Sequence, residues 1–246
     1  MGKLAGRTAV VTGAATGLGR GIALLFADEG ADVAVIDRNG EGAARTAETI
    51  RARGRRSAAA TADVGDETAV ERAFAEVRAK LGDADILVNN AGIVSVAMLE
   101  DMKTAMWDEL IRINLKSVFL CTRAALPGMQ KKNYGRIINI SSQLAHKGAL
   151  GMTHYAAAKA GILGFTRSLS YEVAKYNITV NAICPGPIDT DMKLPPDWAA
   201  KKQSELIVGR QGKVEEIAPT ALLLASEAGG FYIGATMNPN GGDIMV

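Results

Sequence analysis

Short apolar runs alternate with amphipathic stretches along the whole chain. The β-branched runs occupy residues 8–12, 32–37, 85–89, 135–141 and 178–184, and weaker runs occupy residues 57–63 and 235–239. Helical patterns with one polar face cover residues 18–29, 41–53, 67–81, 103–129, 155–176 and 214–226. Nearly continuous apolar strands that alternate with helices are typical of a parallel sheet with helices on both faces. The pattern therefore predicts a single α/β domain over residues 1–246.

One segment interrupts this alternation. Residues 189–212 are irregular and contain two adjacent prolines, Pro195 and Pro196. Long excursions inside compact domains often serve as active-site lids, so we expect a substrate lid here. Ligands of open parallel sheets bind beyond the carboxyl ends of the strands. Functional side chains are therefore expected immediately after each predicted strand.

The composition adds several exclusions. Hydrophobic residues make up 48% of the chain, charged residues 22%, and the formal net charge is +2. So small an excess of positive charge does not indicate a nucleic-acid partner. No apolar run approaches the ~18 residues of a membrane span. Only Cys121 and Cys184 are present, which excludes a disulfide framework and favours the cytoplasm. His146 and His154 form no metal-ligand pattern with them, so we expect no metal and place both histidines at the surface or in loops.

A glycine-rich turn follows the first predicted strand and opens a helix. It contains Gly13, Thr16, Gly17, Leu18 and Gly19. Such a turn lets backbone N–H groups approach a pyrophosphate, which the positive end of the following helix also attracts. A structural tight turn is the alternative explanation of the glycines in isolation. The closing Gly-Lys-Ser/Thr of a P-loop is missing.

An acidic residue ends the second predicted strand. Asp37 lies eighteen residues past Gly19, where a carboxylate can bind the 2′-hydroxyl of an adenosine ribose and repel a 2′-phosphate. A helix cap is the alternative for Asp37 alone. Further along, Asp63 and Val64 can contact adenine, and the turn Asn90-Ala91-Gly92 can border the ribose, although ordinary loops explain each separately. Together with the glycine turn, these residues predict dinucleotide binding.

Acid/base chemistry is suggested after the fifth predicted strand. Ser142 ends that strand region, and Tyr155 and Lys159, four residues apart, share one helix face. A phenol serves as a base near neutral pH only if its pKa of ~10 falls by roughly three units, about 4 kcal/mol. An ammonium group and an oxidised nicotinamide can supply that shift, while Ser142 holds a substrate oxygen and Asn114 a water. An ordinary surface pair is the alternative; a hydrolase is not indicated, because no Gly-x-Ser-x-Gly occurs.

In their order and spacing, these motifs resemble the short-chain dehydrogenase/reductase family over essentially the whole chain. The resemblance implies a Rossmann fold, a doubly wound parallel sheet of seven strands in the order 3-2-1-4-5-6-7. It implies a homotetramer built through the long helices and the C-terminal strand. It implies a catalytic tetrad of Asn114, Ser142, Tyr155 and Lys159, with Tyr155 and Lys159 also near the cofactor. It further implies contacts to the nicotinamide end from Pro185, Gly186, Ile188 and Thr190.

The resemblance extends to 3-oxoacyl-carrier-protein reductases, but four positions depart from their pattern. Those NADP enzymes typically carry Arg at the positions of Thr16, Asn133 and Tyr176. They carry no acidic residue at the position that Asp37 occupies here. Arg38 can accept a 2′-phosphate or stack on adenine. With Asp37 directly before it, we expect NAD rather than NADP. An NADPH-dependent carrier-protein reductase is the alternative.

The substrate is expected to be a small uncharged secondary alcohol or ketone. Besides Ser142, the predicted pocket residues are Gln143, Leu144, Met152, Pro187, Met192 and Trp198. They are mostly apolar, which favours a substrate without charge. A non-catalytic dinucleotide-binding regulator is the hypothesis of another class. A lyase or epimerase with tightly held NAD is a third, and it usually has a longer chain.

Overall fold

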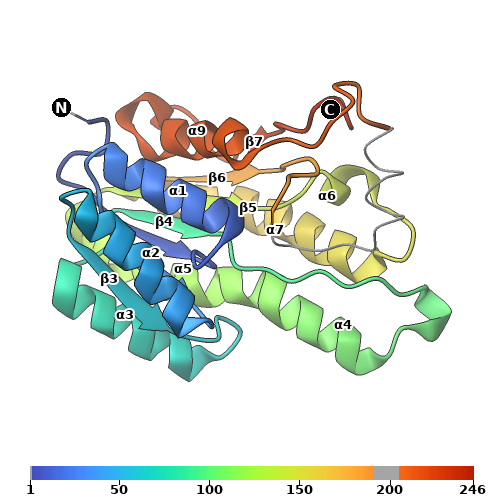
Figure 1. Cartoon of the computed structure of the whole chain (residues 1–246), viewed down its shortest axis with the longest axis horizontal. Coiled ribbons are helices and arrows are strands. Elements are labelled where there is room, and N and C mark those ends of the chain that lie inside the picture. Colours follow the sequence, from blue (N-terminus) through green and yellow to red (C-terminus); the bar gives the residue numbers. More distant parts are fainter. Residues whose placement is uncertain (1, 191–204) are drawn as a thin grey trace.

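The computed structural model describes residues 2–190 and 205–246, and its centre is one parallel sheet (Figure 1). The seven strands pair in the order β3-β2-β1-β4-β5-β6-β7. The fold and strand order expected from the sequence are therefore confirmed. The strands are β1 (Thr8–Thr12), β2 (Asp32–Asp37), β3 (Ser57–Thr61), β4 (Ile86–Asn89), β5 (Gly135–Ile140), β6 (Ile178–Ile183) and β7 (Thr236–Met237).

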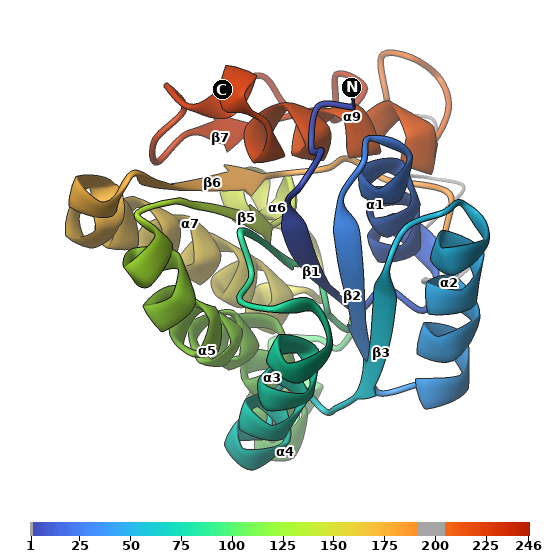
Figure 2. The same cartoon turned by 90° about the vertical axis from the view of Figure 1, so that its left-hand side faces the viewer.

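Helices cover both faces of the sheet because successive strand side chains point to opposite sides. In β1, Ala9 and Val11 pack into one apolar core, whereas Val10 packs into the other. The first core is closed by α1 (Gly17–Asp28), α2 (Gly40–Ala52) and α9 (Val214–Ala225). The second is closed by α3 (Glu67–Leu81), α5 (Ser117–Lys132) and α7 (Thr153–Val173), on the opposite side in Figure 2.

The long helix predicted over residues 103–129 is divided in three. It consists of α4 (Thr104–Ile111), a π-helical turn η2 (Arg112–Lys116) and α5, which continues to Lys132. Asn133 then ends the helix in a left-handed conformation, with φ 49°. A π turn adds a residue to one helical turn and is often found at functional sites. It lies where Asn114 faces the cleft described below.

The other boundaries differ from the predictions mainly at element ends. The predicted helices at 18–29, 41–53 and 214–226 agree within one residue, but α7 begins two residues early and is followed by the 3-10 turn η3 (Ala174–Tyr176). Strand β3 ends at Thr61 rather than 63. Among the described residues, three short elements lie outside the helices predicted from periodicity. They are α6 (Leu144–Lys147), η1 (Leu99–Asp101) and η4 (Glu227–Gly229).

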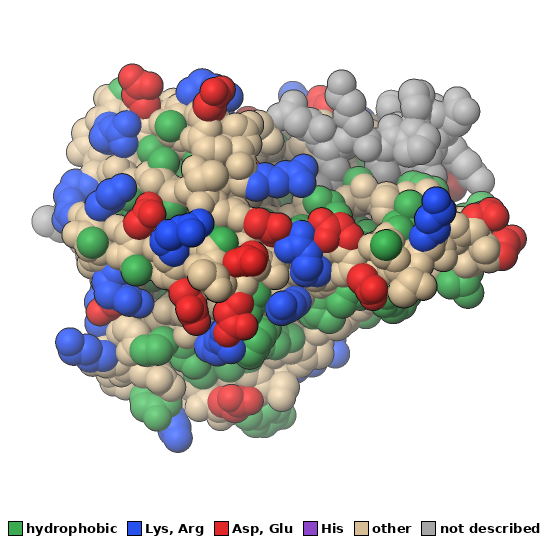
Figure 3. Space-filling model, turned by 90° about the horizontal axis from the view of Figure 1, so that it is seen from below, with side chains coloured by type: hydrophobic (Ala, Val, Ile, Leu, Met, Phe, Trp, Pro, Cys, Tyr) green, Lys and Arg blue, Asp and Glu red, His purple; other side chains and the backbone are tan. Residues whose placement is uncertain are grey.

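The predicted lid over 189–212 lies mostly outside the described residues. Its described ends meet, since Ile188 pairs with Gly212 and the Asp189 amide donates to the Gly212 carbonyl at 3.0 Å. Across residues 2–190 and 205–246, no helix is long and apolar enough to cross a membrane. On the side of α3 and α4, acidic and basic side chains alternate over the surface (Figure 3).

Candidate active site

A single cleft of about 520 Å³ follows the carboxyl ends of six strands. It unites segments that are distant in sequence, as the parallel topology requires. Most of the predicted residues line it: Gly13, Thr16, Gly17, Leu18, Asp37, Arg38, Asp63, Val64, Asn90, Ala91, Gly92, Asn114, Ser142, Gln143, Leu144, Met152, Tyr155, Lys159, Pro185, Gly186, Pro187, Ile188 and Thr190. Gly19 does not line the cleft, and Met192 and Trp198 lie outside the described residues.

The glycine turn packs directly against the loop after β4. Gly13 has φ +64°, and a Cβ added there would lie 2.7 Å from the Ala91 Cα. The Asn90 side-chain amide donates to the carbonyls of Thr12 and Gly13 at 2.9 and 3.0 Å. A Cβ at Gly19 would lie 2.4 Å from the same amide nitrogen. Gly19 therefore permits close packing behind the turn rather than lining the cleft.

Asp37 joins the end of β2 to the glycine turn. One carboxylate oxygen accepts the Ala15 N–H at 3.0 Å and the other the Asn39 N–H at 2.9 Å. Each oxygen retains a second lone pair for a ribose hydroxyl. Thr16, the N-cap of α1, makes no side-chain capping bond, so the first N–H groups of α1 remain for an anion. These donors and acceptors fit a dinucleotide.

Asp63, the predicted adenine contact, forms an ion pair. Its carboxylate lies 2.9 Å from the Arg112 guanidinium and also accepts the Gly65 N–H at 2.9 Å. Arg112 binds Glu109 through two hydrogen bonds as well, at 2.7 and 2.9 Å. Hydrogen bonding to Glu109 raises the pKa of Arg112. The sequence reading missed Arg112, although it lies two residues before Asn114.

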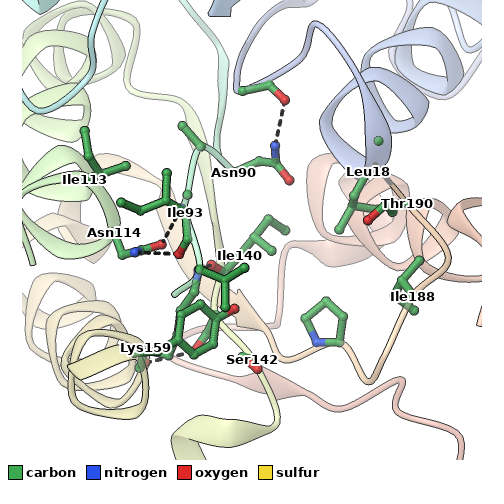
Figure 4. Close-up of a pocket in the computed structure, with 18 of the residues that line it drawn as sticks. Leu18, Asn90, Ile93, Ile113, Asn114, Ile140, Ser142, Lys159, Ile188 and Thr190 are labelled. Atoms are coloured by element: carbon green, nitrogen blue, oxygen red, sulfur yellow. Dashed lines mark hydrogen bonds between the residues drawn. The ribbon is translucent and has the colours of Figure 1, made fainter. Parts of the chain in front are cut away.

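The predicted catalytic residues gather at the other end of the cleft (Figure 4). The Lys159 Nζ donates to the Ile140 carbonyl at 2.8 Å and lies 5.6 Å from the centre of the Tyr155 ring. The Asn114 amide donates to the Ile93 carbonyl at 3.0 Å, and its oxygen accepts the Ile93 N–H at 3.2 Å. The Ser142 hydroxyl accepts the Leu144 N–H at 3.1 Å. The two hydrogen bonds with Ile93 hold the Asn114 side chain in place in the π turn.

Burial shifts the pKa values of both Tyr155 and Lys159. Burial raises the pKa of Tyr155 to about 12, although a hydrogen bond with Ser142 opposes this. Burial also lowers the pKa of Lys159 to about 8. Loss of solvation penalises the charged form of both groups. The two side chains by themselves therefore do not bring the phenol toward neutrality, and the predicted shift, which requires an oxidised nicotinamide beside Lys159, stays a prediction.

The substrate end of the cleft is largely apolar. Leu144 and Met152 are buried there, and the side-chain oxygen of Gln143 has no hydrogen-bond partner among the described residues. Several lining residues were not predicted, because most are apolar or small and none of them belongs to a motif that indicates chemistry. They are Ala62, Ile93, Val94, Ile113, Ile140, Ser141 and Gln211. Within the described ranges, no three His, Cys, Asp or Glu side chains are grouped to hold a metal ion.

A family model described as short chain dehydrogenase matches residues 7–197, well over half of the chain. The chain belongs to this family. Family members are oxidoreductases that act on alcohol or keto groups with NAD or NADP, so the chain is an enzyme of that class. The predicted family and enzyme class are confirmed. The hypothesis of a non-catalytic regulator was wrong.

Relatives with several names align with nearly the whole chain. A 3-oxoacyl-[acyl-carrier-protein] reductase of Pseudomonas aeruginosa is 42% identical over 98% of this chain and 99% of its own length. A (2S)-[(R)-hydroxy(phenyl)methyl]succinyl-CoA dehydrogenase subunit of Thauera aromatica is 39% identical over 96% of both chains. A Sinorhizobium meliloti protein, provisionally described as a short-chain alcohol dehydrogenase, superposes with a TM-score of 0.93, 39% identity and coverage of 98% and 97%.

Proposed function

We propose that this dehydrogenase prefers NAD and interconverts a secondary alcohol and a ketone, with Tyr155 as the general acid/base. The supporting observation is one continuous cleft, lined by Ser142, Tyr155 and Lys159 at one end and by Asp37 at the other. Cys121 and Cys184 are both buried and free, which fits a reducing cytoplasm. Pro185, Gly186, Ile188 and Thr190 would hold the nicotinamide end.

In this mechanism the chain positions the reacting atoms and moves one proton. Ser142 donates a hydrogen bond to the substrate oxygen, and Tyr155 takes the proton from the alcohol or returns it to the ketone. When bound, the nicotinamide would accept or supply the hydride, and its oxidised form would add a positive charge. Lys159 holds the nicotinamide ribose and favours the phenolate. Asn114 holds a water that links Lys159 to solvent.

The preference for NAD rests on Asp37. Its charge repels a 2′-phosphate, so we expect kcat/KM to favour NAD over NADP at least tenfold, about 1.4 kcal/mol. Asp37→Asn removes the charge and keeps one oxygen acceptor, so one of the two backbone hydrogen bonds of Asp37 can persist, and the change should raise kcat/KM with NADP about tenfold. Steady-state oxidation of a panel of secondary alcohols with both cofactors measures this. Asp28→Asn, a change of a surface carboxylate on α1, is the control, and equal use of both cofactors by the unmodified enzyme contradicts the proposal.

NADPH-dependent reduction of a carrier-protein substrate is the second candidate. The 42% identity to an enzyme of that name favours it. The surface offers little support: Asn133 ends α5, Tyr176 is half-buried, and the Lys132 ammonium already binds the Asp83 carbonyl and Asp85 at 2.7 and 2.8 Å. We therefore expect low kcat/KM for an acetoacetyl-carrier-protein compared with small ketones. Efficient reduction of it with NADPH would favour the second candidate instead.

We also propose that the enzyme assembles as a homotetramer. The segment before the edge strand β7 and the helices α4, α5 and α7 carry large apolar side chains that one copy leaves exposed. They include Trp107 on α4, Phe119 on α5, Tyr171 on α7, and Phe231 and Ile233 before β7. Exposed apolar surface of this kind is typical of interfaces between copies.

A further inference from the structure

Two segments border the substrate end of the cleft and are joined by hydrogen bonds. One is residues 93–97, which follow β4; the other is residues 151–155, which lead into α7. The Ala97 N–H donates to the Gly151 carbonyl at 3.0 Å. The Ser95 hydroxyl and the Nε2 atom of His154 lie 2.8 Å apart and form a side-chain hydrogen bond.

His154 is fully buried, with 0% of its surface exposed. The sequence-based expectation of a surface or loop position was therefore wrong, because α7 begins two residues earlier than predicted and turns His154 inward. Burial lowers the pKa of His154, which favours the neutral imidazole. Its Nδ1 atom has no hydrogen-bond partner in the part of the chain that the structure describes. The bond to Ser95 is thus the polar contact that the structure gives this imidazole.

This contact completes the support of one cleft wall. Ile93 and Val94 line the cleft, and the Asn114 amide holds Ile93 through its N–H and its carbonyl. Ser95, the next residue after this pair, is held by His154. The wall is therefore clamped on both sides of Val94. Since Tyr155 follows His154 directly, the same bond ties the proposed acid/base to the opposite wall.

We propose that His154 is a positioning residue that, through Ser95, sets the width of the substrate pocket between Tyr155 and the Ile93–Val94 wall. This inference rests on the proposed function. His154 and Ser95 do not line the cleft themselves, so they act through their neighbours. They determine which ketones fit, rather than how the cofactor binds.

The test compares variants that remove the bond from either side. His154→Leu removes the polar atoms at similar volume, Ser95→Ala removes the hydroxyl, and His154→Gln retains an amide of similar reach. Thr153→Ala, an exposed position one residue away, is the control. Each variant is assayed with a small ketone such as butanone and a bulky one such as acetophenone. Cofactor affinity is measured separately by fluorescence titration.

We expect His154→Leu and Ser95→Ala to raise KM for butanone about three- to tenfold, the effect of losing one neutral hydrogen bond. The ratio of kcat/KM for acetophenone to that for butanone should rise, because the wall is less constrained. The double variant should resemble either single one, since both remove the same bond. His154→Gln should restore much of the loss, and cofactor affinity and Thr153→Ala should stay unchanged.

Hydrogen exchange provides a readout independent of turnover. The Ala97 amide, bonded to Gly151, should exchange faster in His154→Leu and Ser95→Ala but not in Thr153→Ala. If His154 and Ser95 served stability alone, the variants would contain less active enzyme and would lose activity equally on both ketones. The ratio of kcat/KM for acetophenone to that for butanone would then stay unchanged. That result, in either variant, overturns the inference alone. Failure of the unmodified enzyme to turn over any alcohol or ketone overturns the proposed function as well.

Discussion

Tyr155 and Lys159 line the same cleft, and loss of solvation there disfavours the charged form of each: the phenolate of Tyr155 and the ammonium of Lys159. Spacing on a helix was sufficient to predict that both side chains face the same cleft with Ser142. It was not sufficient to predict their pKa values, because the neighbouring chain segments that remove water come from distant parts of the sequence. Lys159, bonded to the Ile140 carbonyl, is also only 4% exposed and is not part of an ordinary helix surface pair. The residue types indicate the chemistry, and burial determines its energetics.

Tyr155→Phe tests the acid/base assignment. The ring packing is retained and only the hydroxyl is lost, so folding and cofactor binding should persist. Turnover should fall by about 10²- to 10⁴-fold, as expected when a general acid/base is removed. Steady-state alcohol oxidation and a cofactor titration measure the two effects. Tyr171→Phe keeps the ring on the proposed tetramer surface, where the side chain is 90% exposed in one copy, and should leave turnover and cofactor binding unchanged. A folded Tyr155→Phe enzyme with unchanged turnover decides against the assignment.

Lys159 should also make stability depend on pH. Its pKa is about 8 in the folded protein and ~10.4 in an unfolded chain. Between these values the unfolded chain binds a proton that the folded chain does not, so the free energy of unfolding rises with pH. The rise amounts to about 3 kcal/mol when complete.

Burial raises the pKa values of Cys121 and Cys184, which lowers the free energy of unfolding over the same pH range, so the contribution of Lys159 must be read as a difference between two proteins. In urea denaturation from pH 7.5 to 9.5, the free energy of unfolding of the unmodified protein should rise relative to that of Lys159→Met. The exposed Lys131→Met should follow the unmodified protein, and a constant difference between the unmodified protein and Lys159→Met is the contrary result.

At the scale of elements, hydrophobic periodicity predicted the helices, which bury one face, and the central strands, which are buried on both faces. It could not reveal the π turn at Arg112–Lys116. One extra residue in a helical turn changes the spacing of the apolar residues too little to stand out from the normal variation of the pattern. It also missed α6, a four-residue helix that is too short to show a period. Both elements lie along the cleft. The least predictable segments are therefore those that hold Asn114 and Leu144 in the cleft.

The glycine turn can be tested by separating backbone strain from crowding. Gly13 and Gly54 both have positive φ, at +64° and +78°, but only Gly13 lies against another segment. Gly54→Ala should cost about 1–2 kcal/mol from the left-handed conformation alone. Gly13→Ala must additionally push the turn away from Ala91, so it should destabilise the protein further and weaken cofactor binding. Denaturation and cofactor titration distinguish the two variants. Equal effects would mean that the contact with Ala91 is unimportant.

For the whole molecule, the sequence pattern alone predicted a parallel sheet between two layers of helices. The order β3-β2-β1-β4-β5-β6-β7 came from the family resemblance, because strand order depends on long-range pairing that periodicity does not contain. The pattern also does not show what lies beyond one copy. Strand β7 is an edge of the sheet, and unpaired edges are commonly covered by another chain.

Two separate apolar faces should form the proposed tetramer. Tetramers with two-fold symmetry need two different interfaces, each joining a pair of copies. Phe231, 98% exposed, lies in the segment before β7, and Phe119, 44% exposed, lies on α5, which packs against the second core. Burying an aromatic side chain contributes roughly 2–3 kcal/mol, so an introduced charge at either face should disrupt that contact.

Phe231→Asp and Phe119→Asp should therefore each yield dimers, and the double variant monomers. Light scattering after size-exclusion chromatography should give about four times the 25.8 kDa chain mass for the unmodified enzyme and about twice that mass for each single variant. Leu150→Asp, a change at another exposed apolar side chain outside both faces, should leave the tetramer intact. Because the cleft lies within one copy, the dimers should still bind the cofactor. A tetramer that survives both substitutions would mean that the copies associate through surfaces other than these two faces.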